Sequence, residues 1–365
     1  MSPSRILTGS TITLAVAALM ILLTVMNVEA TRPEDIVDEE APEVVGVAWL
    51  NSGPLKIGDL RGKVVLVDFW EYTCINCLRT LPYVTEWNRR YADKGLIIIG
   101  VHTPEFEFGK EVDNVKDAVK RFNIEYPVVL DNEYETWSNY ENRYWPRKYL
   151  VDKEGIIRYD HIGEGAYDEI ENEIQQLLRE INPADQLPAI MEPIRGADKP
   201  GAVCYPVTPE LYCGYLRGRL GNPAGYSAET IIDYEDPGEH VDGNIYLNGR
   251  WYNSGEFVQH GEQTDSLNDY IAIKYHALEV NAVIKQSGRD AFKVYITQDG
   301  RNIVPEDRGD DVQVEADGRT FLLINEPRMY NIIRNKIFGS HELQLASMSG
   351  EFEIYAYTFG SCEIP

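Results

Sequence analysis

The chain has 365 residues, enough for an export segment and two ordinary domains that each bury a core of their own. Its 59 acidic side chains outnumber the 34 basic ones, and the formal net charge is −25. A surface of this charge repels DNA, RNA and anionic lipid headgroups, so nucleic-acid binding is disfavoured. A solubility adaptation without any partner would produce the same acidity, so charge alone names no function.

The N-terminus carries an apolar segment. Residues 6–28 have no charge, Arg5 precedes them and Glu29 follows. The positive-inside bias therefore puts the bulk of the chain outside the cytoplasm. We interpret residues 1–30 as a signal peptide or a membrane anchor, because residues 28–30 (VEA) resemble a cleavage site while the uncharged stretch is nearly long enough to span a bilayer. The protein is expected to be membrane-anchored and facing the extracytoplasmic side, or secreted.

An acidic spacer and an α/β domain come next. Residues 31–43 are rich in acids and proline, the composition of a solvated spacer. Over residues 44–182, short apolar runs alternate with amphipathic ones, which predicts an α/β domain. The expected elements, in chain order, are a strand at 64–70, a helix at 78–91, a strand at 96–101, a helix at 112–122, a strand at 127–130, a hairpin of strands 148–151 and 156–161, and a helix at 167–181.

The last part of the chain has a different character. Residues 183–203 contain four prolines and little periodicity, so they are interpreted as a Pro-rich interdomain linker. Over residues 204–365, short β-type runs separated by Gly, Asp and Asn turns predict an all-β jelly roll or β-sandwich. The expected strands are 243–252, 270–284, 291–297, 320–324, 330–333, 341–345 and 352–359.

Three cysteines lie in the β region, at Cys204, Cys213 and Cys362. An odd set in an exported domain predicts one disulfide and one free thiol. Their spacing leaves the pairing open. A bond from Cys362 to either Cys213 or Cys204 would tie the two ends of the domain together, because first and last strands are often neighbours in a jelly roll.

The chemistry points to Cys74 and Cys77, which stand where a buried strand ends and a helix begins. Backbone N–H groups of the first helical turn, together with the helix dipole, stabilise a thiolate on Cys74, the expected nucleophile. Cys77 is one turn away and can resolve a mixed disulfide by intramolecular exchange. No cofactor beyond this redox-active pair is expected.

A zinc site is the competing interpretation. Structural zinc needs about four ligands, commonly two Cys-x-x-Cys pairs or one pair with histidines. The chain has no second Cys-x-x-Cys, so we expect redox chemistry and no metal.

Residues 67–77 (VDFWEYTCINC) and the Leu81-Pro82 pair resemble the active-site segment of the thioredoxin superfamily. Residues 62–66 (GKVVL) and the extra helix and strand before Pro127 resemble its TlpA-like branch, whose members are extracytoplasmic thiol reductases. Residues 100–106 (GVHTPEF) look more narrowly like DipZ proteins. In the β region, the segments similar to the DipZ C-terminal module are 208–214 (TPELYCG), 330–333 (YNII) and 355–360 (YAYTFG).

This resemblance implies roles for two further residues. Asp68 matches the buried carboxylate that relays a proton for the resolving cysteine, and a buried Asp has a raised pKa that suits a general base. A solvent-facing strand-end acid is the alternative. Pro146 matches the family's cis-proline, whose backbone docks a substrate strand beside the cysteines, although an ordinary trans proline would also suit a loop.

Neighbouring side chains are candidates for substrate contact. They are Trp70, Glu71, Tyr72, Ile75, Asn76 and Trp145. For Trp70, Glu71, Tyr72 and Trp145, simple loop packing explains the residue type equally well. His102 follows a buried strand and could reach the same face, but a lone histidine is more often a satisfied polar group.

The expected function is reduction of disulfides in exported proteins, including apocytochrome c, and its direction comes from the resemblance only. DipZ proteins commonly carry a CcdA-type electron conduit, so here the electrons are expected from a separate membrane partner of that type. The same chemistry could also run as an oxidase or isomerase.

An alternative of another class is a cell-surface protein that binds glycan or protein through its β region. The family's likeness to carbohydrate-binding modules suggests sugar contacts by Trp251, Tyr252 and Tyr275, although such rings usually belong to a core.

Overall fold

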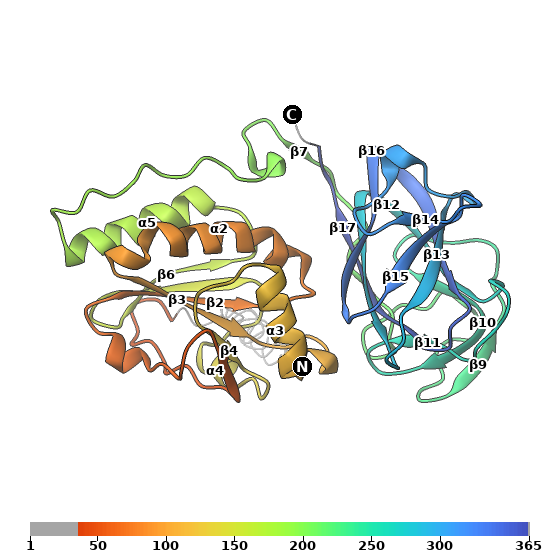
Figure 1. Ribbon diagram of the computed structural model, residues 1–365, viewed down its shortest axis with the longest axis horizontal. Coiled ribbons are helices and arrows are strands. Elements are labelled where there is room, and N and C mark those ends of the chain that lie inside the picture. Colours follow the sequence, from red (N-terminus) through yellow and green to blue (C-terminus); the bar gives the residue numbers. More distant parts are fainter. Residues whose placement is uncertain (1–35, 364–365) are drawn as a thin grey trace, which may run out of the picture.

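The structure is a computed structural model that describes residues 36–363. The predicted signal or anchor segment, residues 1–30, lies outside the described residues. Within the described range, no helix combines the length and apolar character needed to cross a bilayer. Two regions stand side by side, one of mixed α/β structure and one of β structure (Figure 1).

A six-stranded mixed sheet organises the first region, with strand order β1-β4-β3-β2-β5-β6. Strands β2, β3 and β4 are parallel, whereas β1, β5 and β6 run antiparallel to their neighbours. The strands are β1 Ala48–Leu50, β2 Val64–Trp70, β3 Leu96–His102, β4 Val128–Leu130, β5 Arg147–Val151 and β6 Ile157–Ile162. The helices are α2 Ile75–Tyr91, α3 Val112–Arg121, α4 Glu135–Asn139 and α5 Tyr167–Ile181. This is the expected thioredoxin fold, and β1 and α4 are the elements that the sequence pattern missed.

The two faces of this sheet have separate cores. Successive side chains of a strand point to opposite faces, so Leu66 and Trp70 pack beneath α2, α3 and α5 while Val67 and Phe69 pack against the other side. Strands buried on both faces have continuous apolar sequences, which explains why β2 and β3 could be predicted from the sequence.

The acidic spacer was expected to be solvated, and its acidic side chains at Asp38, Glu39 and Glu40 are exposed, but its described backbone docks on the domain. The Asp38 N–H donates to the Ile157 carbonyl at 2.7 Å, Glu40 bridges to Ile156, and Ala41 is buried. Glu43 accepts hydrogen bonds from the N–H groups of Ile57 and Gly58. The Glu43 carboxylate and the spacer backbone thus dock on the domain, which composition alone does not reveal.

The Pro-rich linker also packs against the first region instead of crossing solvent freely. Gln175 donates to the Pro188 carbonyl and the Met191 N–H donates to Glu171, both at 2.8 Å. Near its end, the Ile194 N–H donates to the Tyr83 hydroxyl at 2.9 Å. The proline spacing correctly indicated the absence of long helices and strands, but not this docking.

The second region is antiparallel β structure. Its strands are β7 Val203–Cys204, β8 Leu211–Tyr212, β9 Ile231–Tyr234, β10 Ile245–Asn253, β11 Val258–His260, β12 Tyr270–Gln286, β13 Phe292–Gln298, β14 Gln313–Val314, β15 Thr320–Ile324, β16 Arg328–Ser347, β17 Phe352–Gly360 and β18 Cys362–Glu363. The long strands β12 and β16 pair along most of their length, and β17 also pairs with β12. Strands β7 and β18 form a small sheet of their own.

One correction concerns β16, which was expected as two strands. The pairing of β16 with β12 shifts register between Ala277 and Glu279 of β12, opposite Gly339 and Arg334. Among the intervening residues, Lys336 and Ile337 are exposed, Ile337 at 78%, whereas Asn335 is buried. Because the alternation of buried and exposed side chains is interrupted here, the sequence pattern predicted two strands where the backbone forms one.

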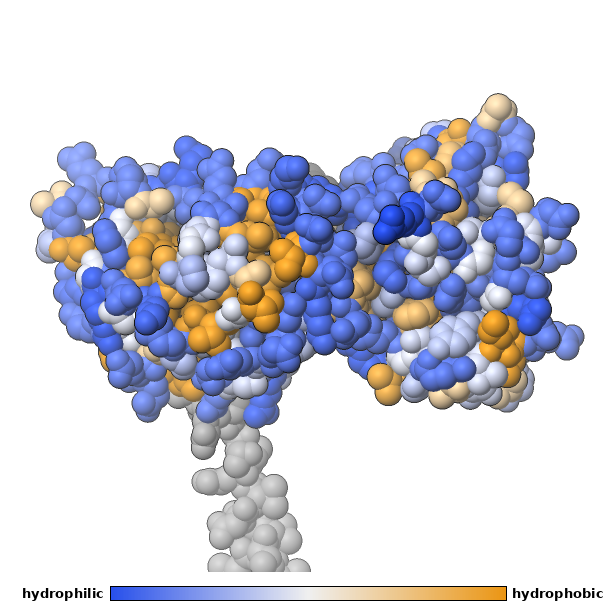
Figure 2. Space-filling model, turned by 60° about the horizontal axis from the view of Figure 1, so that its bottom comes forward, coloured by the Kyte–Doolittle hydropathy of each residue, from blue (hydrophilic) through white to orange (hydrophobic). Residues whose placement is uncertain are grey.

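The core of the first region continues into the second. Val283, Met329, Tyr355 and Ala356 of the β region belong to the same cluster of buried side chains as the residues beneath α2. On the face shown in Figure 2, the hydrophobic side chains gather mainly on the thioredoxin-like half.

Candidate active site

The helix α2 begins directly after Cys74, which caps it. The Leu78 N–H donates to the Cys74 carbonyl at 3.0 Å, and the Cys77 N–H donates to the Cys74 sulfur at 3.2 Å. Cys74 is half-buried, whereas Cys77 is 1% exposed. The Cys74 sulfur thus has a backbone N–H donor at the start of the helix and stays within reach of a substrate. The other thiol is shielded from solvent.

A buried carboxylate lies beneath the pair. The alternation along β2 turns Asp68 toward the helix α2 side, and burial raises the pKa of Asp68 while the nearby Lys148 ammonium lowers it. Lys148 Nζ lies 3.4 Å from Asp68 Oδ1. Burial likewise raises the pKa of the Cys77 thiol, and the neighbouring Cys74 and Asp68 raise it further.

Lys148 was missed in the sequence interpretation. It sits directly opposite Asp68 in the antiparallel pairing of β2 with β5. Its position could have been found only by placing the predicted hairpin next to β2 in the correct register. A lysine inside an otherwise buried strand is the signal that was available, since buried lysines are rare without a partner.

The peptide bond between Trp145 and Pro146 is cis. The Trp145 indole donates to the Thr103 carbonyl at 3.1 Å and packs on Trp137 at 4.3 Å between ring centroids. Among residues 36–363, the backbone N–H and C=O of Trp145 have no hydrogen-bond partner. These backbone groups beside the cis bond can hydrogen-bond to another strand.

The expectation that Trp70, Glu71 and Tyr72 line the rim of the site is wrong, because all three are buried at 1% exposure or less. Tyr72 stacks on His102 at 5.5 Å and packs against Phe108. His102 is itself fully buried, so it does not reach the surface either. Of the six proposed contact residues, Ile75, Asn76 and Trp145 stay partly exposed.

Glu71 instead supports the loop in front of Cys74. Its Oε2 accepts the Thr73 N–H at 2.6 Å and the Thr73 hydroxyl at 2.5 Å. Its Oε1 lies 3.7 Å from His102 Nε2. A buried carboxylate that accepts two hydrogen bonds from one residue fixes that residue, so Glu71 positions the loop and does not contact substrate.

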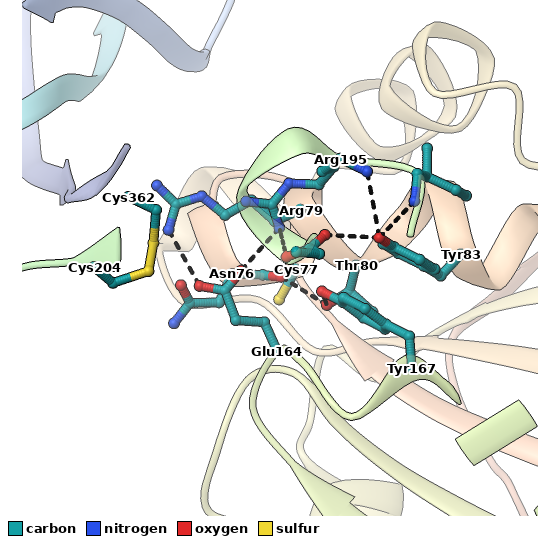
Figure 3. A network of polar contacts seen from close by, with 12 residues as sticks. Asn76, Cys77, Arg79, Thr80, Tyr83, Glu164, Tyr167, Arg195, Cys204 and Cys362 are labelled. Atoms are coloured by element: carbon teal, nitrogen blue, oxygen red, sulfur yellow. Dashed lines mark hydrogen bonds and ion pairs between the residues drawn. A yellow bond between two sulfur atoms is a disulfide. The ribbon is translucent and has the colours of Figure 1, made fainter. Parts of the chain in front are cut away.

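A cleft of about 840 Å³ lies between the start of α2 and the β region. We call it the interdomain cleft, and its lining includes Ile75, Leu78, Arg79, Arg195, Arg334 and Cys362. Glu164 holds both Arg79 and Arg195, at 3.2 and 3.1 Å (Figure 3). These arginines were not singled out from sequence, since they come from segments far apart in the chain.

The cysteines of the β region separate into a pair and a single thiol. Cys204 and Cys362 form a disulfide, and Cys213 is free and fully buried, with a pKa raised by burial. Within residues 36–363, no three His, Cys, Asp or Glu side chains are grouped to hold a metal ion.

Two of the aromatic residues considered for glycan contact are in the core. Trp251 and Tyr275 are fully buried, so neither offers a ring face to a sugar. Tyr252 is half-buried, and its hydroxyl donates to Glu229. The alternating strand pattern placed these rings inside, as it does for most aromatic residues in β structure.

Comparison with known proteins decides the family. Residues 36–178 match the Redoxin family model, and residues 208–360 match the model of a thioredoxin-like C-terminal domain. The thiol-disulfide oxidoreductase ResA of Bacillus cereus is 30% identical over 141 residues, which cover 39% of this chain and 78% of ResA. The chain belongs to the thioredoxin-like thiol-disulfide oxidoreductases.

A second relative matches this oxidoreductase across both regions. Protein DipZ of Mycobacterium tuberculosis is 33% identical over 328 residues, 88% of this chain and 43% of DipZ. The chain thus spans less than half the length of DipZ. Human NHL repeat-containing protein 2 is 40% identical over 140 residues, 38% of this chain and 19% of that protein. The match to DipZ extends the family assignment from the thioredoxin-like region to the β region.

Proposed function

We propose that this oxidoreductase acts outside the cytoplasm as a reductase of disulfides in exported proteins. The observation that carries the proposal is the pairing of a half-buried Cys74 at the start of α2 with a buried Cys77 above Asp68. One sulfur is accessible to a large substrate, and the other is accessible only to Cys74.

The reaction follows from this arrangement. The Cys74 thiolate attacks one sulfur of the substrate disulfide, and the other substrate sulfur leaves as a thiolate that takes up a proton. Cys77 then gives its proton to Asp68 and attacks the Cys74 sulfur. The second substrate thiol is released, and Cys74 and Cys77 are left as a disulfide.

The high pKa of Cys77 makes the base necessary. Burial and the neighbouring groups keep Cys77 protonated near neutrality. Asp68, whose own pKa is raised by burial, is the nearest carboxylate suited to accept that proton. The Lys148 ammonium favours the anionic form of the Asp68 carboxylate, which is the form that can accept the proton.

Substrate docking uses the unpaired backbone of Trp145. A substrate strand that hydrogen-bonds to these groups lies next to cis-Pro146, and the partly exposed Ile75 and Asn76 at the start of α2 are further candidates for substrate contact. Main-chain pairing of this kind tolerates many side chains. That suits an enzyme that acts on several exported proteins.

Location and electron supply complete the proposal. A disulfide between Cys204 and Cys362 supports an oxidising compartment, and the uncharged segment at residues 6–28 supports export. Electrons for the Cys74–Cys77 pair come from a separate membrane donor of the CcdA type, as the likeness to DipZ suggests.

The test is a redox titration of the full chain combined with insulin reduction. A reductase has a Cys74–Cys77 potential well below that of glutathione and reduces insulin in the presence of dithiothreitol. Cys74→Ser abolishes turnover, whereas the matched control Cys213→Ser, at a buried thiol, retains it. A potential near that of strong oxidants, about −120 mV, would instead identify an oxidase.

A further inference from the structure

We propose that Cys204 and Cys362 are a second redox-active pair, which exchanges its disulfide with Cys74 and Cys77 across the interdomain cleft. The inference rests on the redox role proposed above for Cys74 and Cys77. It adds a centre in the β region that receives electrons from the thioredoxin-like region within the same chain.

The second pair borders the same cavity as the start of α2. Cys362 lines the interdomain cleft together with Ile75, the residue after Cys74. The approach is close on the β side, because a Cβ built on Gly360 would lie 2.7 Å from the Arg79 guanidinium. Arg79 stands one helical turn after Ile75, and Gly360 stands two residues before Cys362.

The second disulfide is accessible, unlike a disulfide inside a core. Its strands β7 and β18 are each two residues long and form a sheet separate from the main β sheet. Cys204 is exposed and Cys362 is half-buried, whereas the third cysteine of this region, Cys213, is fully buried. A thiolate can therefore reach the Cys204–Cys362 bond without unfolding of the β core.

Cationic side chains line the cleft that Cys362 borders, namely Arg79, Arg195, Arg334 and Lys336. Arg79 and Arg195 pair with Glu164, and Arg334 pairs with Asp310, so Lys336 is the lining cation that makes no ion pair among the described residues. The Ser361 hydroxyl lies 4.0 Å from the Cys362 sulfur, within reach of a weak hydrogen bond. Thiolate leaving groups are stabilised by nearby cations and donors, which speeds exchange.

The exchange balances within the chain. The Cys74 thiolate attacks Cys362 or Cys204, the bond between those two breaks, and the other sulfur leaves as a thiolate. Cys77 loses its proton to Asp68 and attacks Cys74, which frees the second β-region sulfur. Two electrons and two protons pass from the Cys74–Cys77 dithiol to the Cys204–Cys362 disulfide, and the reverse sequence returns them.

The alternative is a purely structural clamp that joins residues 158 positions apart. Such a bond would stabilise the region by restricting its unfolded chain. A clamp and a redox centre differ in one measurable respect, since only the redox centre exchanges with Cys74.

The first experiment traps the intermediate in the full-length Cys77→Ser variant. After acid quenching, alkylation and digestion of the monomer, peptide mapping is expected to find Cys74 linked to Cys362 or Cys204 in part of the molecules. The matched control, Cys74→Ser with Cys77 retained, yields only the Cys204–Cys362 link because Cys77 is buried. If Cys77→Ser also yields only that link between pH 6 and pH 9, the inference is overturned.

The second experiment measures how fast dithiothreitol reduces the Cys204–Cys362 bond in full-length protein. In the double variant Cys74→Ser/Cys77→Ser, reduction is expected to be slower than in the wild type by roughly tenfold or more, since the internal route is lost. Equal reduction rates in the wild type and the double variant would mean that the Cys204–Cys362 bond is a structural clamp. If the wild type reduces insulin but its Cys204–Cys362 bond is reduced no faster than that of the double variant, only this inference is refuted. If the wild type fails to reduce insulin, the proposed function is refuted.

Discussion

Lys148 Nζ lies 3.4 Å from Asp68 Oδ1 in the centre of the thioredoxin-like sheet, with side chains 1% and 2% exposed. The two residues oppose each other on neighbouring strands β2 and β5. A charge pair this deep is costly to form and costlier to break, because either partner left alone is a buried unpaired charge. The pair also sets the protonation of the carboxylate next to Cys77.

The first prediction concerns the pH dependence of turnover in Lys148→Met. Burial raises the pKa of Asp68 and Lys148 lowers it, so removing the ammonium moves that pKa upward. The carboxylate is then ionised only at higher pH, and the acidic limb of the rate profile shifts by about one pH unit or more toward alkaline values. Insulin reduction from pH 5 to pH 9 measures the limb. Lys148→Arg, which keeps the charge, should leave it in place; an unmoved limb in Lys148→Met would exclude Asp68 as proton acceptor.

The same pair predicts a stability pattern. Lys148→Met and Asp68→Asn should each cost about 3 kcal/mol at pH 7, and the double variant should cost clearly less than their sum. In Lys148→Met, the pKa of Asp68 is higher in the folded state than in the unfolded state. Asp68 therefore lowers the free energy of unfolding as pH rises through the folded-state pKa, and has little effect below the unfolded-state pKa. Urea unfolding at pH 5 and pH 8 checks both points, and additive costs would show that the two groups do not interact.

Glu71→Ala should loosen the segment before Cys74. The substitution removes the carboxylate oxygen that accepts both Thr73 hydrogen bonds and leaves a buried N–H unpaired, at a cost of about 1–3 kcal/mol. The rate of insulin reduction should fall together with stability in Glu71→Ala. Thr73→Val removes only the hydroxyl donor and should therefore lower stability less. Glu133→Ala at an exposed position serves as control and should change stability by no more than about 0.5 kcal/mol. A stable but inactive Glu71→Ala would point to direct chemistry.

Tyr355→Ala should uncouple the two regions. Its ring is 2% exposed and packs edge-on against Phe106 and Phe108 of the thioredoxin-like region, at 5.1 and 4.8 Å. The resulting cavity costs about 3–5 kcal/mol. Calorimetry is expected to show two unfolding transitions where the wild type has one. The control Tyr144→Ala, at a ring 47% exposed, should preserve the single transition.

Thiol accessibility predicts an order of modification. In the reduced protein, iodoacetamide should label Cys74 before Cys77 and should not label Cys213 without denaturant, since burial raises the pKa of Cys213 and excludes the reagent. Mass spectrometry of timed, quenched samples follows each site. Labelling of Cys213 at the rate of Cys74 would mean that the β region opens readily.

The sequence predicted the elements that are buried on both sides or carry a strong period. The strand β2 and the helix α5 appear with the expected bounds, because a continuous apolar run and a 3.6-residue period are local signals. The strands β1 and β18 were missed because they have three and two residues and owe their pairing to distant partners. Short strands have too little pattern to be read locally.

By itself, the sequence determined an α/β domain and placed Cys74 and Cys77 where a strand ends and a helix begins, since both depend on local spacing. The thioredoxin-like fold and the role of Asp68 were implied by the resemblance of this segment to the thioredoxin superfamily. Only the tertiary structure decided that Lys148 faces Asp68, that Trp70, Glu71 and Tyr72 point inward, and that Cys204 pairs with Cys362 beside the active-site helix. The physical reason is that register between strands and contact between domains depend on residues far apart in the chain, and local spacing carries no record of them.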